Sequence, residues 1–191
     1  MSDKIYCYPD SDVLINNLNI HDPNKLYEAE RKLTMLRLMD LFNNPIKGKF
    51  DLKHLQNIHK YIFQDIYPWA GKIRTVDIAK SNMFCKVQFI ETQAKEIFRK
   101  LQDDFYLREL SKETFIKKAA YYFSEINALH PFREGNGRTQ REFMRQLSYN
   151  AGYILHFVTI SDQEMLDASI DSFLCNYEKM EILFAKIIEV R

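Results

Sequence analysis

Glycine and proline, the residues that most often interrupt regular structure, are scarce: the 191 residues include five of each. Their scarcity leaves long stretches without a helix-breaking signal, which favours long helices. Nearly half of the residues are apolar, and this composition excludes an intrinsically disordered chain. A chain of this length can bury a hydrophobic core of its own, so we expect a single domain over residues 1–191.

The sequence also lacks an excess of charge, because 27 lysines and arginines face 26 acidic residues. This balance gives no reason to expect direct binding of nucleic acid or an acidic, solvated tail. No run of about 18 apolar residues occurs, so no membrane partner is expected. The N-terminal stretch MSDKIYCYPD has no apolar core of the kind found in signal peptides.

Cysteine is the third scarce residue type. Cys7, Cys85 and Cys175 are odd in number, far apart, and form no CxxC pair. This pattern predicts reduced thiols rather than a disulfide framework or a zinc site. Together with the absence of a signal peptide, it predicts a cytoplasmic protein.

Helical spacing of apolar residues extends through most of the chain. Asp22 and Pro23 suit the N-cap and first position of a helix that continues to Leu41. Asp51 can begin a second helix, and Ser161 opens a capping-box pattern. Further helices are expected at residues 89–101, 111–129, 139–151, 161–175 and 178–190.

One segment departs from this spacing. In GKIRTVDIAKSNMF, the branched residues Ile73, Val76 and Ile78 are separated by polar ones, and residues 80–82 suit a turn. The pattern predicts one short β-hairpin, at about residues 71–85, in an otherwise all-α fold.

The stretch ALHPFREGNGRTQR places a histidine, a carboxylate and a Gly-Asn-Gly sequence between two predicted helices. Pro131 disfavours helical geometry at His130, so the first helix should end there and present the imidazole at a loop. Gly135, Asn136 and Gly137 can take positive φ angles and turn successive N–H groups toward one point. The helix that follows has free N–H groups and a dipole, both of which favour an anion.

Charged side chains surround this loop. Arg138 and Arg141 are three residues apart on one helix face, where their guanidinium groups can bind phosphate oxygens. Glu134 would repel phosphate unless a cation lay between them, and a carboxylate beside phosphates is a usual ligand of Mg²⁺. Each residue alone has a plainer explanation as a helix terminator, a turn or a solvated charge. Their joint spacing instead predicts a histidine base, His130, beside a Mg²⁺–polyphosphate site.

Residues 130–141 resemble the Fic family motif, His-Pro-Phe-x-(Asp/Glu)-Gly-Asn-Gly-Arg-x-x-Arg, and match it at every defined position. The stretches YCYPDSDVLINNLNI, NPIKGKFDLKHLQNIHKYIFQDIYPWAGKIRT and SDQEMLDASIDSF also resemble stand-alone bacterial Fic toxins of the adenylyltransferase type. The resemblance implies a mostly helical domain with a β-hairpin flap over the active site. It also implies transfer of AMP from ATP to a hydroxyl side chain of a target protein, with release of pyrophosphate.

By position, the resemblance makes His130 the general base and Glu134 the ligand of Mg²⁺. The ATP phosphates would be bound by Gly135, Asn136, Gly137, Arg138 and Arg141. Within this set, Arg138 is expected at the distal phosphates and Arg141 at the γ-phosphate.

The flap is expected to pair its edge with an extended segment of the target protein. The residues of this edge would be Ile78, Ala79, Lys80, Ser81, Asn82, Met83 and Phe84. At such an edge Met83 and Phe84 would be unusually exposed. Related toxins often carry Ser-Lys-Gly-Asn where this chain has AKSN, so the flap departs from the family pattern.

Many Fic proteins are blocked by a helix bearing (Ser/Thr)-x-x-x-Glu-(Gly/Asn), whose glutamate pairs with the second motif arginine. Here only Thr92 and Glu96 have that spacing, and Ile97 follows them. We therefore expect no blocking helix in this chain and a separate antitoxin that supplies a glutamate to Arg141. For this toxin type the resemblance implies the ATPase subunits of type II topoisomerases as targets, namely the DNA gyrase B subunit and its topoisomerase IV counterpart.

Other functions stay open at this point. Phosphorylation, as in the Doc branch of the family, is disfavoured because that branch replaces the second motif glycine by lysine, and this chain has Gly137. Transfer of UMP or phosphocholine remains an alternative, since pocket side chains choose the donor. A non-catalytic binding module is disfavoured by the intact His130, Glu134 and Arg141. His54 and His59 lie about 140° apart on a predicted helix, which favours surface or packing roles over metal binding.

Overall fold

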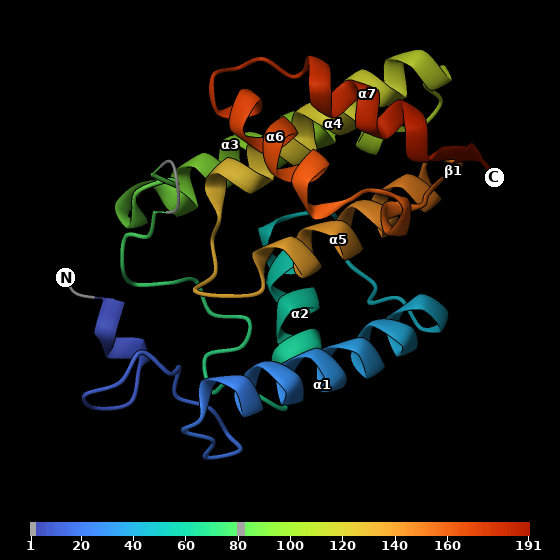
Figure 1. The fold of residues 1–191 in the computed structure, drawn as a ribbon. Coiled ribbons are helices and arrows are strands. Elements are labelled where there is room, and N and C mark those ends of the chain that lie inside the picture. The colour runs from blue at the N-terminus through green and yellow to red at the C-terminus, as the bar shows by residue number, and fades with distance from the viewer. Residues whose placement is uncertain (1–2, 80–82) are drawn as a thin grey trace.

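The computed structural model describes residues 3–79 and 83–191 (Figure 1). Its helices are α1 (Pro23–Asn43), α2 (Leu52–Phe63), α3 (Ile90–Asp103), α4 (Lys112–Leu129), α5 (Asn136–Asn150), α6 (Asp162–Phe173) and α7 (Glu178–Ile187). Short 3-10 turns lie at Asp3–Tyr6, Val87–Phe89, Phe105–Leu107 and Phe157–Thr159. The strands are β1 (Tyr153–Leu155) and β2 (Ile188–Val190), so the mainly helical fold predicted from the sequence is confirmed.

Helix α5 lies at the centre of this arrangement (Figure 1). It packs against α2 on one side and α4 on the other, while α1 covers α2, and α3 and α7 pack on α4. The core between them encloses Ile58 and Ile62 of α2, Phe115 of α4, and Phe143 and Leu147 of α5 completely. This packing fixes the first turn of α5, which belongs to the Gly-Asn-Gly motif, in the interior of the fold.

The helix starts follow the capping residues predicted from the sequence. Asp22, Asp51 and Ser161 each accept a hydrogen bond from the backbone N–H three residues further on. Ser161 and Glu164 also form the complete capping box. Because these caps satisfy N–H groups that have no helical partner, the boundaries are set locally and could be predicted locally.

The C-terminal segment differs from the prediction of one helix over residues 178–190. Helix α7 ends at Ile187, and the next three residues pair antiparallel with β1, with Tyr153 opposite Val190. A three-residue strand has too few positions for an alternating pattern to show, so this two-stranded sheet could not be predicted from the spacing of apolar residues.

The predicted hairpin contains residues 80–82, which lie outside the described residues. On either side of them, Ala79 and Met83 form one antiparallel bridge. The N–H of Phe84 also donates to the carbonyl of Ile78, over 3.3 Å. The flanks of the segment therefore run antiparallel, and this bridge is the strand-like pairing observed in the described part of the segment.

No helix in the described ranges combines the length and the apolar character needed to cross a bilayer. None of the three cysteines forms a disulfide in the part of the chain that the structure describes; Cys7 is buried and Cys175 is exposed.

Candidate active site

Helix α4 ends at Leu129, and His130 follows in the left-handed conformation, with φ +43° and ψ +61°. The structure thus confirms the helix end predicted from Pro131. The imidazole is 9% exposed and stacks on the ring of Phe84, with centroids 3.6 Å apart and planes 14° apart. Its Nδ1 lies 3.2 Å from the carbonyl oxygen of Asn127.

A cavity of about 220 Å³ lies beside this imidazole. The motif residues that line it include His130, Glu134, Asn136 and Gly137, and the residues before the flap turn that line it include Ile78 and Ala79. The structure therefore brings together the predicted base, the predicted metal ligand and the start of α5. It also places one flank of the flap over them.

The loop between α4 and α5 is closed by the side chain of Asn136. Its Oδ1 accepts the N–H of Phe132 over 2.9 Å, and its Nδ2 donates to the carbonyl of the same residue over 2.7 Å. Gly135 has φ +81°, as predicted, whereas Gly137 lies within α5 and has no positive φ. The prediction of positive φ angles throughout Gly-Asn-Gly was therefore wrong for Asn136 and Gly137, because α5 already begins at Asn136.

The first turn of α5 is open. Its N-cap, Gly135, has no side chain to bind the free N–H groups, which are left available to an anion. Gly137 lies next to Arg141, since a Cβ at Gly137 would be in ordinary van der Waals contact with Nη1 of that arginine, at 3.5 Å. The N–H groups of the helix start and the Arg141 guanidinium are thus adjacent.

Arg141 carries a half-buried guanidinium group. Across the described part of the chain, no group forms a hydrogen bond or ion pair with its guanidinium. Burial lowers its pKa and the nearby charge of Arg138 lowers that pKa further, whereas the charge of Asp162 opposes the shift. A half-buried guanidinium without a partner is costly, and an anionic ligand would remove that cost.

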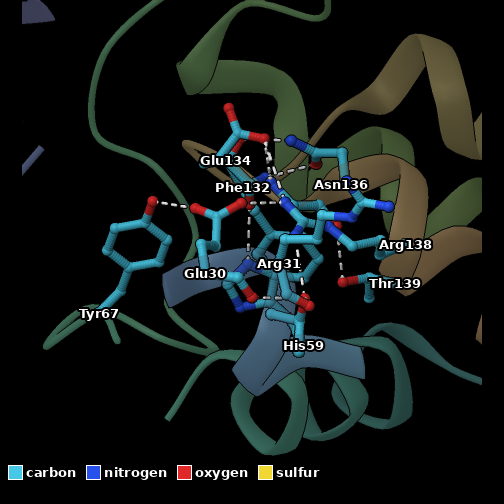
Figure 2. A network of polar contacts seen from close by, with 11 residues as sticks. Glu30, Arg31, His59, Tyr67, Phe132, Glu134, Asn136, Arg138 and Thr139 are labelled. Atoms are coloured by element: carbon cyan, nitrogen blue, oxygen red, sulfur yellow. Dashed lines mark hydrogen bonds and ion pairs between the residues drawn. The ribbon is translucent and has the colours of Figure 1, made fainter. Parts of the chain in front are cut away.

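Arg138 is in the opposite situation (Figure 2). It donates to a carboxylate oxygen of Glu30 and to the hydroxyl of Thr34, the latter over 3.1 Å. The hydroxyl of Tyr67 donates to the other oxygen of Glu30, and burial followed by the charge of Glu30 raises the pKa of that tyrosine. The guanidinium of Arg138 also lies over the ring of Phe63, 4.7 Å from its centroid.

Sequence reasoning missed Glu30 and Thr34, which come from α1 and are more than 100 residues away from Arg138 along the chain. The arginine predicted to bind distal phosphates is therefore already fixed in place by a carboxylate. Its orientation is determined before any phosphate arrives.

Glu134 meets the requirements of a magnesium ligand. One carboxylate oxygen accepts the N–H of Gly135 over 2.8 Å, and the side chain, 44% exposed, lines the cavity. No group of three or more potential metal-binding side chains occurs in the described ranges. Mg²⁺ is commonly held by one or two carboxylates together with water and substrate phosphates, so a single carboxylate at this position fits it.

His59 connects the motif loop to the segment before the flap. Its Nδ1 accepts the N–H of Gly71 over 2.7 Å, so the proton must be on Nε2, which lies 2.9 Å from the carbonyl oxygen of Glu134. The ring also stacks on Phe132 at 3.9 Å. Burial lowers the pKa of His59 to about 4, and the ring is therefore neutral at pH 7. The predicted packing role is confirmed, but the two hydrogen bonds carried no sequence signal.

The predicted target-docking residues do not share one environment. Ile78 and Ala79 line the cavity, and Met83 is 60% exposed. Phe84, expected at an exposed edge, is 8% exposed because its ring covers His130 and contacts Phe173. Its exposure was predicted wrongly, since the apolar ring packs inward. Lys80, Ser81 and Asn82 lie outside the described residues.

Comparison with known proteins identifies the family that this chain matches. Residues 49–148 match the model of the Fic/DOC family. Protein adenylyltransferase VbhT of Bartonella schoenbuchensis is 43% identical over 97% of this chain, which spans 39% of that relative. An Escherichia coli K12 protein named Probable protein adenylyltransferase Fic is 35% identical, and the match covers 98% of this chain and 96% of that protein.

Solved structures agree with these relatives. The N-terminal Fic domain of a VirB-translocated effector from Bartonella quintana, with bound ADP, has a TM-score of 0.94 at 32% identity, covering 98% of this chain and 95% of that one. BepC of Bartonella tribocorum, with bound AMPPNP, has a TM-score of 0.93 at 28% identity, covering 98% of both chains.

Gly135 offers a test of how the loop geometry supports the site. In Gly135→Ala the new Cβ would lie 2.1 Å from Cζ of Phe63, which carries Arg138 on its face. Backbone strain and overpacking together should destabilise the fold by about 2–5 kcal/mol and abolish ATP binding. Gly152→Ala is the matched control, because Gly152 has φ +90° but open space around it. Urea unfolding and calorimetry with ATP measure both effects, and equal ATP affinity in the two variants would contradict this account.

His59 predicts a dependence of stability on pH. The unfolded chain protonates this histidine near its ordinary pKa of about 6.5, whereas the folded chain does so at about 4. Because the unfolded state binds more protons between these values, the free energy of unfolding should fall by about 3 kcal/mol as the pH drops through that window.

His59→Gln, which keeps one donor and one acceptor, isolates this contribution from the titration of other groups. The difference between the two free energies of unfolding should change between pH 6.5 and pH 4 and level off below. A difference that stays constant with pH would rule out the buried neutral state of His59.

Proposed function

This chain belongs to the Fic/DOC family, and we propose that it is a protein adenylyltransferase that transfers AMP from ATP to a hydroxyl side chain of a target protein. The observation that carries the proposal is the cavity that joins His130, Glu134 and the open first turn of α5. Relatives named protein adenylyltransferase, and similar Fic structures with bound ADP and AMPPNP, support this donor class.

In the proposed reaction His130 acts on the target hydroxyl. If Nδ1–H donates to the carbonyl of Asn127, Nε2 is left as the basic nitrogen. It takes the hydroxyl proton while the hydroxyl oxygen bonds to the α-phosphorus and the bond to pyrophosphate breaks. Most of the acceleration is expected from alignment and charge stabilisation by the fixed surroundings.

The start of α5 would hold the triphosphate. The N–H groups of its first turn stabilise the transferred phosphate, and Arg141, whose guanidinium forms no hydrogen bond or ion pair with the described residues, binds the γ-phosphate. Arg138 reaches the distal phosphates while Glu30 holds it. Glu134 is the residue that would bind Mg²⁺, whose charge neutralises phosphate oxygens when it is bound.

The unmet charge of Arg141 also supports regulation by another protein. A separate small antitoxin would place a glutamate on Arg141 and displace the γ-phosphate. Within this chain, Glu30 pairs with Arg138, and Glu96, the one residue with the spacing of a blocking glutamate, pairs with Arg99 on the surface of α3. The isolated chain is thus the active form.

The target remains a proposal from family resemblance. We propose the ATPase subunits of bacterial type II topoisomerases, namely the DNA gyrase B subunit and its topoisomerase IV counterpart. The flap residues from Ile78 to Phe84 would dock the target segment, and the whole of residues 1–191 would act as one cytoplasmic toxin domain. Direct nucleic-acid and membrane binding are not part of this proposal.

The proposed reaction predicts transfer of a label that depends on His130. Purified chain, Mg²⁺ and ATP labelled at the α-phosphate are incubated with bacterial lysate. We expect a labelled protein of topoisomerase-subunit size with the unchanged chain and with His156→Ala, a control at a half-exposed histidine paired with Glu189. No label should form with His130→Ala.

The other outcomes separate the remaining functions. Label from the γ-phosphate alone would indicate phosphorylation, and label from UTP or a phosphocholine donor would indicate a different transferred group. If no donor gives His130-dependent label, the chain is a binding module. Activity that appears only after an internal segment is deleted would disprove control by a separate protein.

Another prediction tests Arg141 as the γ-phosphate ligand. Loss of a charge-assisted contact should weaken ATP binding by about 10- to 100-fold in Arg141→Ala. Binding of AMP, which has no γ-phosphate, should be unchanged. Arg99→Ala removes an exposed arginine of α3 as the control. Calorimetry measures the affinity for each nucleotide. Equal losses of affinity for ATP and AMP would contradict the assignment.

A further inference from the structure

Arg74 is one of the largest side chains that the fold encloses, with 1% of its surface exposed. A carboxylate oxygen of Asp77 lies 3.9 Å from its Nη1, too far for a hydrogen bond, and accepts the N–H of Val87 over 2.8 Å instead. Burying a guanidinium is unfavourable unless hydrogen bonds compensate for the lost hydration. The groups that Arg74 binds therefore indicate the role of its buried charge.

The side chain of Arg74 donates its hydrogen bonds to backbone carbonyls. Nε donates to His130 over 2.8 Å, Nη1 donates to Val76 over 2.7 Å, and Nη2 donates to Cys85. The backbone N–H of Arg74 also donates to Pro131 over 2.9 Å. One residue thus connects both flanks of the flap to the catalytic loop, which is the loop between α4 and α5 that begins at His130.

The bonds to the loop act where the backbone is strained. His130 has the left-handed φ of +43°, a conformation that is strained for a bulky residue and persists only where the surroundings impose it. Arg74 binds the carbonyl of His130 with its side chain and the carbonyl of Pro131 with its backbone. Two successive peptide groups are therefore held by one residue, and their orientation decides where the imidazole points.

The bond to Cys85 acts on the other side of the imidazole. Cys85 directly follows Phe84, whose ring stacks on His130 with a centroid separation of 3.6 Å. The N–H of Cys85 donates to the carbonyl of Ala128 at the end of α4, over 3.0 Å. With both polar backbone groups of Cys85 bound, Phe84 is held against the imidazole.

We propose that Arg74 is a positioning residue for adenylyl transfer, which holds His130 and Phe84 in the arrangement that aims the base into the cavity. The inference rests on the proposed function only in naming that reaction. Lysine cannot replace Arg74, because a single ammonium on a flexible stem cannot reach three carbonyls from three segments. None of the bonds of Arg74 goes to the residues that would bind the phosphates, so ATP affinity should not depend on it.

The test compares Arg74→Lys with Arg99→Lys, a control at an exposed arginine of α3. The initial rate of His130-dependent label transfer from α-labelled ATP should fall about 10- to 100-fold in Arg74→Lys, the scale of a misplacement near 1 Å. Its dissociation constant for ATP should stay within about threefold of the unchanged chain. Arg99→Lys should change neither quantity. If Arg74→Lys does not fold by circular dichroism, Arg74→Gln, which buries no charge, takes its place.

A spectroscopic measurement keeps this inference separate from the proposed function. The Hε1 proton of His130, assigned by its absence in His130→Ala, should carry a ring-current shift from Phe84 that changes in Arg74→Lys and not in Arg99→Lys. If no label transfer occurs in the unchanged chain, the proposed function fails and this shift still decides the role of Arg74. An unchanged His130 resonance in the folded variant, or a loss of ATP affinity in step with the rate, would overturn the inference.

Discussion

The open first turn of α5 is the constraint on which the rest of the site depends. A helix start inside a protein normally has its free N–H groups bound by a capping side chain. Here Gly135 supplies none, and the side chain of Asn136 instead closes the loop onto Phe132. The helix start is thus rigid yet unbound, which is the condition for binding an anion without rearrangement.

Charges around this turn are treated in three different ways. Arg138 is paired with Glu30 and held over Phe63, so its position is fixed at the cost of part of its charge. Arg74 is buried and bound only to carbonyls, so its charge serves the backbone. Arg141 forms no hydrogen bond or ion pair in the described ranges, although the charge of Asp162 lies nearby, so its guanidinium is available to a ligand or to an inhibitor. The division explains how closely spaced arginines can have distinct roles.

Local patterns predicted much of this structure, and non-local contacts account for what they missed. Helix starts were predicted from the capping residues Asp22, Asp51 and Ser161. The motif likewise placed His130 and Glu134 at one loop. Both predictions succeeded because caps and turns involve residues that are neighbours in sequence. Glu30, His59 and Arg74 reach the site from distant segments and bind an arginine or backbone carbonyls. No spacing rule in a single sequence reports such pairs. Phe84 was misjudged for the same reason, since its burial depends on α4 and α6.

The pairing of β2 with β1 has a consequence for how this fold can be extended. Strand β1 follows α5 closely, and the N–H of Arg191 donates to the carbonyl of Gly152, so the last described residue lies near the C-terminal end of α5 (Figure 1). The cavity lies at the other end of that helix, about 22 Å away for its 15 residues. A polypeptide fused after Arg191 would leave the molecule on the side remote from the catalytic loop. Delivery signals or further domains could therefore be attached there without obstructing access of nucleotide or target.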